Sequence, residues 1–501
     1  MKILSVGLLG LKAEIIEVES CLGGGEMGLF TIVGLPDKAV SEARERVRGA
    51  ISGIGLKFPK RKIIVNLAPA DFKKHGPSYD LPIAISVLSN VYEFNKNISD
   101  DLFIGELSLN GDIRPVSGIL PIISFAKKIG IRNIYLPIDN LSEASLIKNI
   151  NLCPLKNLKE ITNYLINNIE IKNNKTVNHR KDEDFDYPDF SNIRGHFQAK
   201  RALEIAVAGG HNVLMSGPPG SGKTILAKSI ISIMPKLSEE EIIEVTEIYS
   251  IAGKLNKNNV IFHRPFRSPH HTASSSSIVG GGSWPKPGEI SLAHRGVLFL
   301  DEFPEFSRFV LENLRQPMED GFINVSRAAG TVSFPARFML VGTMNPCPCG
   351  YYGDKNKECV CSANQLGNYQ KKVSGPIKDR IDINISVPRL KFEEITCFKK
   401  EEEKSFLIAQ RINIAQKIQK ERFSNSKIFS NSEINHENID IFCKLDFAKT
   451  AFLKNVIGKL NLSSRAYFKI IKLARTIADL RNSNDIGQDD LSEAIFYHSG
   501  L

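Results

Sequence analysis

The chain has 501 residues, of which 42% are hydrophobic and 24% are charged, and this balance excludes a disordered or fibrous protein. Its 65 Lys and Arg residues exceed its 55 Asp and Glu residues, and the net charge of +10 suits a nucleic-acid partner without establishing one. Eight cysteines do not indicate a disulfide scaffold, and no apolar run approaches the roughly 18 residues of a membrane span. We therefore expect a cytoplasmic protein that does not bind membranes, with about three domains at this length.

Residues 1–165 have the pattern of one α/β domain, in which strands alternate with helices. The apolar run Ile3–Leu11 follows a lysine, as in a signal peptide, but strand-like sequence continues after it, so we assign it to the fold. The other predicted elements are strands at Ala13–Val18, Leu29–Val33, Lys62–Leu67 and Asn133–Leu136, and helices at Lys38–Ile51 and Leu81–Leu88.

Two motifs of this domain resemble the proteolytic domain of the Lon proteases. They are the stretches His75–Leu81 and Gly105–Val116. The resemblance places Ser78 at the position of the nucleophile and places the lysine that acts as its base near Leu120. That lysine is absent, because the nearest candidates, Lys127–Lys128, come seven or eight residues later on the same predicted helix.

A serine without its base is a poor nucleophile. We therefore expect a Lon-protease-like domain that lacks the catalytic lysine and serves structure, assembly or substrate contact. Ser78 is then expected to cap the helix Leu81–Leu88 rather than to catalyse proteolysis.

Residues 166–189 contain few large apolar side chains and show no hydrophobic period. Such a composition is typical of a solvated linker. The sequence therefore predicts a domain boundary near Asp186 and a second domain over residues 190–390.

The second domain begins with a phosphate-binding motif. The strand-like run Asn212–Met215 precedes it and the predicted helix Thr224–Met234 follows it, which is the context that a P-loop requires. Backbone N–H groups of such a loop point at the phosphates, and the helix dipole favours their charge. We expect Lys223 to bridge the β- and γ-phosphates of ATP and Thr224 to hold Mg²⁺. The full motif consists of Gly217, Pro218, Pro219, Gly220, Ser221, Gly222, Lys223 and Thr224.

Two polar segments after the P-loop are predicted insertions. Ser274–Gly288 is rich in glycine and serine, contains the only tryptophan, Trp284, and is predicted to be a mobile loop. The alternating runs Phe322–Ser326 and Thr331–Phe334 predict a hairpin with Arg327 at its tip.

Two further strands end in residues suited to ATP hydrolysis. The apolar run Gly296–Leu300 ends in Asp301, which can fix the Mg²⁺ shell, and Glu302, which can polarise the attacking water. The run Phe338–Met344 ends in Asn345, whose side chain can sense the γ-phosphate.

Four cysteines stand directly after this strand, as two Cys-x-Cys pairs. They are Cys347, Cys349, Cys359 and Cys361. Four thiolates can bind one tetrahedral Zn²⁺, although Cys-x-x-Cys is the commoner spacing, and unbonded thiols are the alternative. The remaining cysteines are isolated and are expected to be buried small hydrophobes; they are Cys21, Cys153, Cys397 and Cys443.

Residues 391–501 are predicted to form a helical lid. Apolar residues recur at helical intervals in Glu393–Phe423 and more strongly in Ser463–Leu480, and a last helix is predicted from Ile486 onward. The expected fold class is thus α/β, with a Lon-protease-like front domain, a central P-loop domain built on a parallel sheet, and a helical lid at the carboxyl end.

Motifs other than the P-loop resemble those of the magnesium-chelatase-like AAA+ ATPases, and within this group those of the ComM family, which is also called YifB. The resemblance extends over almost the whole chain. The stretches that carry this resemblance are Ile193–His196, Arg267–Thr272, Lys286–His294, Arg315–Gly321 and Ser374–Asp382. The resemblance implies a hexameric ring that uses ATP to move branch points in DNA during recombination and natural transformation, with branched or single-stranded DNA as partner.

The family resemblance also assigns roles that the spacing alone does not. It implies that Arg380 is an arginine finger that reaches the ATP of the neighbouring subunit, and that Arg465 is the second sensor on the lid. By analogy with related AAA+ helicases, Arg327 and Lys286 contact DNA phosphates; loops that only shape the subunit interface are the alternative.

Two other functions remain open at this point. An ATPase subunit of a metal-inserting chelatase is one, against which we set the Lon-like front domain and the cysteine quartet. An ATP-dependent protease is the other, and the missing lysine near Leu120 argues against it.

Overall fold

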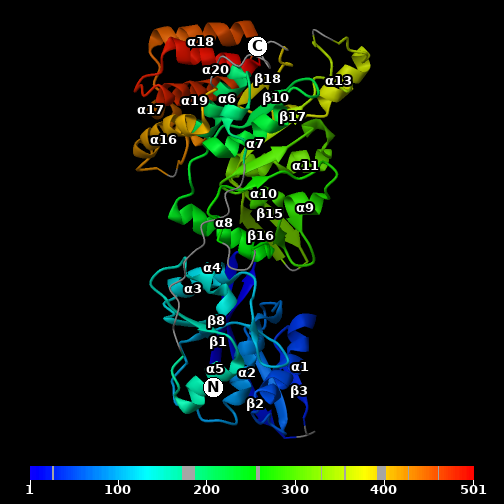
Figure 1. Ribbon diagram of the computed structural model, residues 1–501, viewed down its shortest axis with the longest axis vertical. Helices are drawn as coiled ribbons and strands as arrows, with labels where there is room; N and C mark the ends of the chain where they lie inside the picture. The colour runs from blue at the N-terminus through cyan, green and yellow to red at the C-terminus, as the bar shows by residue number, and fades with distance from the viewer. Residues whose placement is uncertain are drawn as a thin grey trace.

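The structure is a computed structural model of the chain, and it describes residues 1–24, 28–171, 187–255, 260–328, 330–354, 357–391, 402–426, 428–460 and 462–500. Figure 1 shows an elongated molecule with the amino-terminal domain at one end and a second sheet, covered by the carboxyl-terminal helices, at the other. The α/β architecture expected from the sequence is confirmed. The predicted domain boundaries stay predictions, and residues 172–186 of the expected linker lie outside the described part of the chain.

The front domain is built on a seven-stranded mixed sheet in the order β3-β4-β2-β1-β5-β8-β9. Its longest strands, β1 and β2, pair antiparallel, because a tight turn at Gly10 joins them. The strands are β1 (Lys2–Leu9), β2 (Lys12–Gly23), β3 (Phe30–Val33), β4 (Lys62–Ala68), β5 (Leu102–Phe103), β8 (Asn133–Pro137) and β9 (Asn151–Leu155), with a separate small ladder of β6 (Glu106–Leu107) and β7 (Ile113–Arg114).

Helices cover both faces of this sheet and bury a core on each. On one face lie α1 (Lys38–Gly53), α2 (Asp80–Leu88) and α5 (Leu158–Asn167), and on the other α3 (Ile119–Lys128) and α4 (Leu141–Ala144). Helix α1 shows why the sequence folds this way. Its buried residues recur at helical spacing, and the Asp37 carboxylate caps the helix by accepting the N–H of Val40 at 2.8 Å.

Two expectations about single residues of this domain are wrong. Ser78 does not cap α2, because it lies in a short 3-10 turn (Pro77–Tyr79) and α2 begins after Tyr79 without a side-chain cap. Cys21 is exposed rather than buried, whereas Cys153 and Cys443 are buried as expected. Cys397 lies outside the described residues.

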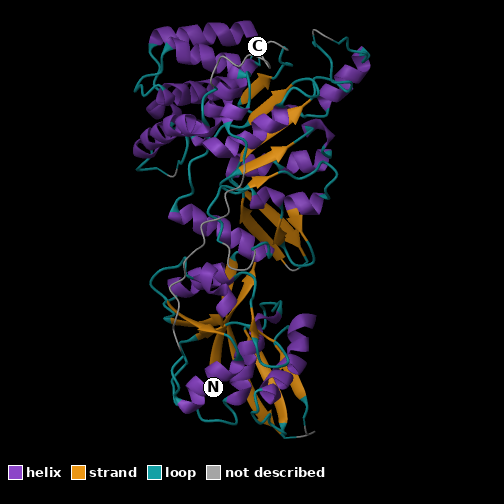
Figure 2. Cartoon of the chain, viewed as in Figure 1, coloured by secondary structure: helices purple, strands orange, loops and turns teal. Residues whose placement is uncertain are grey.

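The second domain contains five parallel strands in the order β11-β14-β17-β10-β18 (Figure 2). All four neighbouring pairs are parallel, so the carboxyl ends of the strands meet at one edge, where α/β proteins bind ligands. The strands are β10 (Val213–Ser216), β11 (Phe266–Arg267), β14 (Val297–Leu300), β17 (Met339–Met344) and β18 (Ile383–Ser386).

The predicted helical lid packs on helices that cover one face of this sheet, and its last helix contacts the edge strand β18. It shares a continuous apolar core with α6 (Phe197–Gly209) and α7 (Lys223–Ile233), so the lid and the sheet are joined by burial as well as by the chain. Its helices are α16 (Ser405–Arg422), α17 (Ile439–Phe442), α18 (Phe447–Leu460), α19 (Ser464–Leu480) and α20 (Gln488–Ser499). None of the helices that the structure describes is both long and apolar enough to cross a membrane.

The opposite face carries short helices and two hairpins. The hairpin predicted around Arg327 is confirmed as β15 (Phe322–Arg327) and β16 (Gly330–Pro335). The segment Ser274–Gly288 is not simply a loop, because it contains α9 (Ser275–Val279) and a second hairpin of β12 (Gly280–Gly281) and β13 (Lys286–Pro287). The remaining elements of this domain are α8 (Glu239–Ala252), α10 (Glu289–Leu292), α11 (Arg308–Asn313), α12 (Arg315–Asp320), α13 (Ala363–Lys371) and α14 (Gly375–Lys378).

The front domain contacts the second domain through α3, α4 and the β1–β2 turn. A Cβ at Gly10, in that turn, would collide with the Val332 side chain on β16. Ser250 on α8 accepts the N–H of Gly118 at 2.9 Å and donates its hydroxyl to the Glu143 carboxylate. Burial of that carboxyl raises the pKa of Glu143 to about 7.

The Glu143 contact predicts a pH dependence of stability. Between its ordinary pKa of 4.5 and the folded pKa of about 7, the folded chain retains a proton on Glu143 that the unfolded chain releases. Raising the pH through this window should therefore cost the parent up to about 1.4 kcal/mol of folding free energy per pH unit relative to Glu143→Gln. Thermal unfolding of both proteins between pH 5 and 8 measures the difference. A constant difference in midpoint over this range would contradict a protonated Glu143 at the contact.

Candidate active site

The phosphate loop lies between β10 and α7, at the edge where the parallel strands end. Gly220 and Gly222 adopt φ angles of +75° and +87°, in the left-handed region that favours glycine, and Gly222 is the N-cap of α7. A Cβ at Gly217 would collide with the carbonyl oxygen of Val387 after β18, so this position also requires glycine. The loop therefore presents backbone N–H groups next to the amino end of α7, as a phosphate site needs.

The Lys223 ammonium lies inside the loop. It donates to the carbonyl oxygens of Gly217 at 2.7 Å and Pro218 at 2.9 Å, and its nitrogen is 3.5 Å from the Asn345 side-chain oxygen. Burial lowers the pKa of Lys223, while the charge of Asp301 opposes that shift. The structure thus brings together the predicted phosphate-binding lysine and the predicted γ-phosphate sensor.

The Asp301 side chain, directly after β14, contacts residues of α7 and β17. Its carboxylate accepts the Thr224 hydroxyl of α7 at 3.3 Å and the hydroxyl of Thr343, a buried residue of β17. One carboxylate oxygen and one hydroxyl oxygen are hard ligands of the kind that Mg²⁺ prefers, with phosphate and water completing its shell. Thr224 and Asp301 therefore fit the predicted Mg²⁺ site.

Glu302 is held in an unusual backbone conformation. Its φ is +53°, and its N–H points to the Asp301 carboxylate at 3.1 Å and to the Thr343 hydroxyl at 3.4 Å. The Glu302 carboxylate lies 3.5 Å from Nδ1 of His271, on the chain that leaves β11. Left-handed backbone at a non-glycine residue is uncommon and is concentrated at functional sites, which suits a residue that positions water.

A cavity of about 430 Å³ opens beside Glu302 and Asn345. Helix α13 forms its far wall, and Lys372 at the end of that helix pairs with Glu305 at 2.8 Å. The cavity is lined by Glu302, Glu305, Asn345, Pro348, Gln365, Asn368, Tyr369 and Lys372. No motif in the sequence pointed to α13 at this site.

The two arginines that the resemblance singled out lie away from the phosphate loop of their own chain. Arg380 donates to the Pro376 carbonyl at 2.6 Å and pairs with Glu319, while its Nε is buried with no hydrogen-bond partner among the described residues. Arg465, at the start of α19, is 3.3 Å from Asp379. Their roles as finger and sensor stay predictions.

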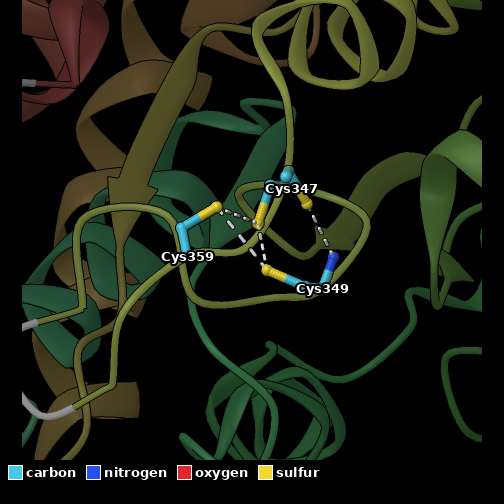
Figure 3. Close-up of side chains that lie close together, drawn as sticks. Cys347, Cys349 and Cys359 are labelled. Carbon is cyan, nitrogen blue, oxygen red and sulfur yellow. Dashed lines mark hydrogen bonds between the residues drawn. The ribbon is translucent and has the colours of Figure 1, made fainter.

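The four clustered cysteines converge on one point. Sγ of Cys347 lies 3.3 Å from that of Cys349 and 3.7 Å from that of Cys359, and Figure 3 shows these three sulfur atoms turned toward one another. All four sulfur atoms lie within 4.8 Å of one another. A backbone hydrogen bond from Tyr351 lowers the pKa of the Cys349 thiol to about 6. The quartet could therefore hold a metal ion.

The predicted DNA-contacting residues lie on adjacent hairpins. The Arg327 guanidinium donates to the Gly280 carbonyl of β12 at 3.4 Å, and Lys286 stands opposite Gly281 in the β12–β13 ladder. Both side chains are exposed. The structure thus places two cations together on one surface, although Arg327 is at the end of β15 rather than in the turn itself.

Known proteins resemble this chain over nearly its full length. Competence protein ComM from Haemophilus influenzae is 41% identical over 98% of this chain and 96% of its own, and the protein YifB from Escherichia coli is 40% identical over 98% and 95%. The chain belongs to the ComM/YifB family. The resemblance inferred from the sequence motifs is therefore confirmed.

Family models of the magnesium chelatase subunit ChlI match three segments of this ComM/YifB chain. They cover residues 189–395, 16–140 and 402–498. The chain thus carries an ATPase module of the magnesium-chelatase type. Because the model that matches residues 16–140 also bears the ChlI name, the front domain does not separate this chain from chelatase subunits, contrary to our expectation. The ChlI subunit from Porphyra purpurea is 25% identical over 31% of this chain and 51% of its own.

Sequence reasoning missed two polar residues of this site. Thr343 lies within a predicted apolar strand, and only its place next to Asp301 shows its role. His271 belongs to the stretch Arg267–Thr272 that carried the resemblance, but nothing in the spacing linked it to Glu302. The sequence signal that could have identified Thr343 is a hydroxyl side chain one residue before the end of an apolar strand.

Thr343 predicts a specific defect in ATP hydrolysis. Thr343→Val keeps the shape of the side chain but removes the hydroxyl that donates to Asp301 and faces the N–H of Glu302. We expect ATP turnover to fall roughly tenfold and the Mg²⁺ requirement to rise, because the Asp301 carboxylate and the backbone N–H of Glu302 both lose a hydrogen-bond partner. ATPase rates measured across a Mg²⁺ titration test this, with Thr343→Ser as the matched control. Equal rates for the Val and Ser variants would show that the hydroxyl has no role.

Proposed function

We propose that this chain is an ATP-driven DNA motor of the branch-migration type, which works as a ring of identical subunits in recombination and natural transformation. The observation that carries the proposal is the convergence of β10, β14 and β17 on one site. Lys223, Asp301 and Asn345 meet there with the hydroxyl of Thr224. ATP and Mg²⁺ are the ligands that such a site binds.

The residues of this site divide the work of hydrolysis among them. Backbone N–H groups of Gly217–Gly222 and the Lys223 ammonium would bind the phosphates of ATP, and Thr224 and Asp301 would hold Mg²⁺. Mg²⁺ held by Thr224 and Asp301 would supply positive charge that offsets the charge of the phosphates. Glu302 would orient the attacking water, and Asn345 would contact the γ-phosphate next to Lys223.

Arg380 would complete the site of the neighbouring subunit. Its guanidinium is held by Glu319 and by the Pro376 carbonyl, and its Nε has no hydrogen-bond partner among the described residues. Exchange of Glu319 for the γ-phosphate of a neighbour's ATP would place the positive charge of Arg380 where the transition state needs one. Arg465 on the lid, whose guanidinium lies 3.3 Å from the Asp379 carboxylate, would act as the second sensor of bound nucleotide.

The DNA contact is proposed for the surface that carries Arg327 and Lys286. Two exposed cations on neighbouring hairpins can bind successive phosphates without reading the bases, which is the mode that translocation requires. The family relative from Haemophilus influenzae is named a competence protein, and competence is the uptake of DNA. The net charge of +10 agrees with a polyanionic partner.

A chelatase ATPase subunit is the second candidate, because the matching family models bear that name. The partial alignment with the ChlI subunit from Porphyra purpurea favours the motor over it. A protease is less favoured still, because Leu120 occupies the position of the missing lysine and is fully buried.

Mixed rings test whether Arg380 acts across subunits. Glu302→Gln and Arg380→Ala should each abolish ATP hydrolysis alone. In a one-to-one mixture, about a quarter of the interfaces would join an intact Glu302 to an intact Arg380 from the neighbour, and activity should return to about that fraction. A mixture of Arg380→Ala with the double variant is the control and should stay inactive. No recovery in the first mixture would place Arg380 outside the neighbour's site.

Dissociation of a labelled four-way DNA junction tests the motor itself. The purified protein should separate the junction when ATP is present, and Lys223→Ala should not, because it cannot bind the phosphates productively. Arg327→Ala and Lys286→Ala should each weaken DNA binding and lower its salt dependence by about one released ion.

Lys57→Ala is a matched control for the DNA contact, because Lys57 is an exposed lysine of the front domain. It should leave binding and junction separation unchanged. A protein that hydrolyses ATP and forms rings but leaves every junction intact would refute the motor and favour a chelatase-type partner.

A further inference from the structure

We propose that the four clustered cysteines bind a single zinc ion, and that this ion fixes the wall of the ATP site to which their loop belongs. The ligands are Cys347, Cys349, Cys359 and Cys361. Zinc binding does not depend on the proposed DNA function. The expected effect of zinc on nucleotide binding rests on the proposed ATP site.

The sulfur geometry fits one tetrahedral ion. A zinc–sulfur bond of about 2.3 Å places the corners of a tetrahedron about 3.8 Å apart. The measured Sγ–Sγ distances are 3.3 Å for Cys347–Cys349, 3.7 Å for Cys347–Cys359 and 3.6 Å for Cys349–Cys359. With the fourth sulfur, all lie within 4.8 Å of one another. The ligands are therefore close to the positions that a zinc ion requires.

Other uses of four cysteines fit less well. All four thiols are free, and 3.3 Å is far from the roughly 2.05 Å of a disulfide bond. An iron–sulfur cluster distributes its cysteine ligands over two or four iron atoms, and ligands on different iron atoms lie farther apart than one tetrahedron edge. Four sulfur atoms gathered around one point match a single ion instead, and soft thiolate ligands in tetrahedral geometry favour zinc.

Backbone N–H groups hold two of the ligands in place. The N–H of Cys349 donates to Sγ of Cys361 at 3.4 Å, and the N–H of Tyr352 donates to Sγ of Cys347 at 3.3 Å. Hydrogen bonds from the surrounding chain orient metal ligands. The loop thus fixes the direction of these two sulfur atoms.

Both ends of the ligand set connect directly to the nucleotide site. Cys347 follows the predicted sensor Asn345 by two residues, and Cys361 immediately precedes Ser362, the N-cap of α13. The loop between them touches the phosphate loop, since a Cβ at Gly350 would lie 2.6 Å from Pro219. An ion that joins the two Cys-x-Cys pairs therefore fixes the end of β17, the start of α13 and one side of the phosphate loop together.

The first test is the metal content of the full chain. Purified protein should contain about one zinc ion per chain by mass spectrometry, and the double variant Cys359→Ser, Cys361→Ser should lose it. Cys21→Ser is the matched control, because Cys21 is an exposed cysteine of the front domain. Replacement of zinc by cobalt(II) should give the visible absorption of a tetrahedral thiolate site. A parent without zinc that also gives no such absorption with cobalt would overturn the metal site.

The second test is reversible removal of zinc from the parent. Dialysis against a chelator should weaken binding of a fluorescent ATP analogue by about tenfold, the effect of losing one well-placed contact, and added zinc should restore it. Circular dichroism should show that the helices persist, which separates a local effect from unfolding. Unchanged ATP affinity in the zinc-free protein would overturn the coupling while leaving the metal site intact. Failure of junction separation would refute only the DNA motor.

Discussion

The hydrogen bond from Thr343 to Asp301 joins β17 to β14, and the geometry of the ATP site depends on this link. The strand register dictates it, because Leu300 pairs with Gly342, which places Asp301 beside Thr343. Ser216 pairs with Met344 on the other side of β17, so the phosphate loop begins next to Asn345. A shift of one residue would turn Thr343 to the opposite face of the sheet and separate the residues that we propose as Mg²⁺ ligand, catalytic glutamate and sensor.

The hairpins that we propose for DNA contact depend on the front domain for support. A two-stranded hairpin is barely stable alone, and β15–β16 buries one face in the core of the second domain while the β1–β2 turn contacts Val332. The β12–β13 hairpin is held similarly, because Trp284 stacks on His75 with ring centres 4.5 Å apart. A force that DNA exerts on Arg327 or Lys286 would therefore be transmitted to both domains.

The sequence was sufficient for features that depend on neighbouring residues along the chain. Strand, glycine-rich turn and helix around Lys223 form a local unit, and the alternation on either side of Arg327 specifies a hairpin. Features that depend on register or domain packing could not be found this way. The contact of His271 with Glu302 joins two chain segments that follow separate strands. The helix and hairpin in Ser274–Gly288 form through packing that a polar composition does not reveal.

The packing of the front domain also explains what replaced the missing lysine. In the resemblance to the Lon proteases, the base would stand near Leu120 at the start of α3. Here the N–H of Leu120 donates to the Glu143 carboxylate at 3.1 Å, and the same oxygen accepts the hydroxyl of Ser250 from α8. The Leu120 side chain is fully buried. A lysine at this position would bury a positive charge at the contact, beside a Glu143 carboxyl that keeps its proton up to a pKa of about 7. The amino end of α3 thus serves domain contact, which supports a structural role for the front domain.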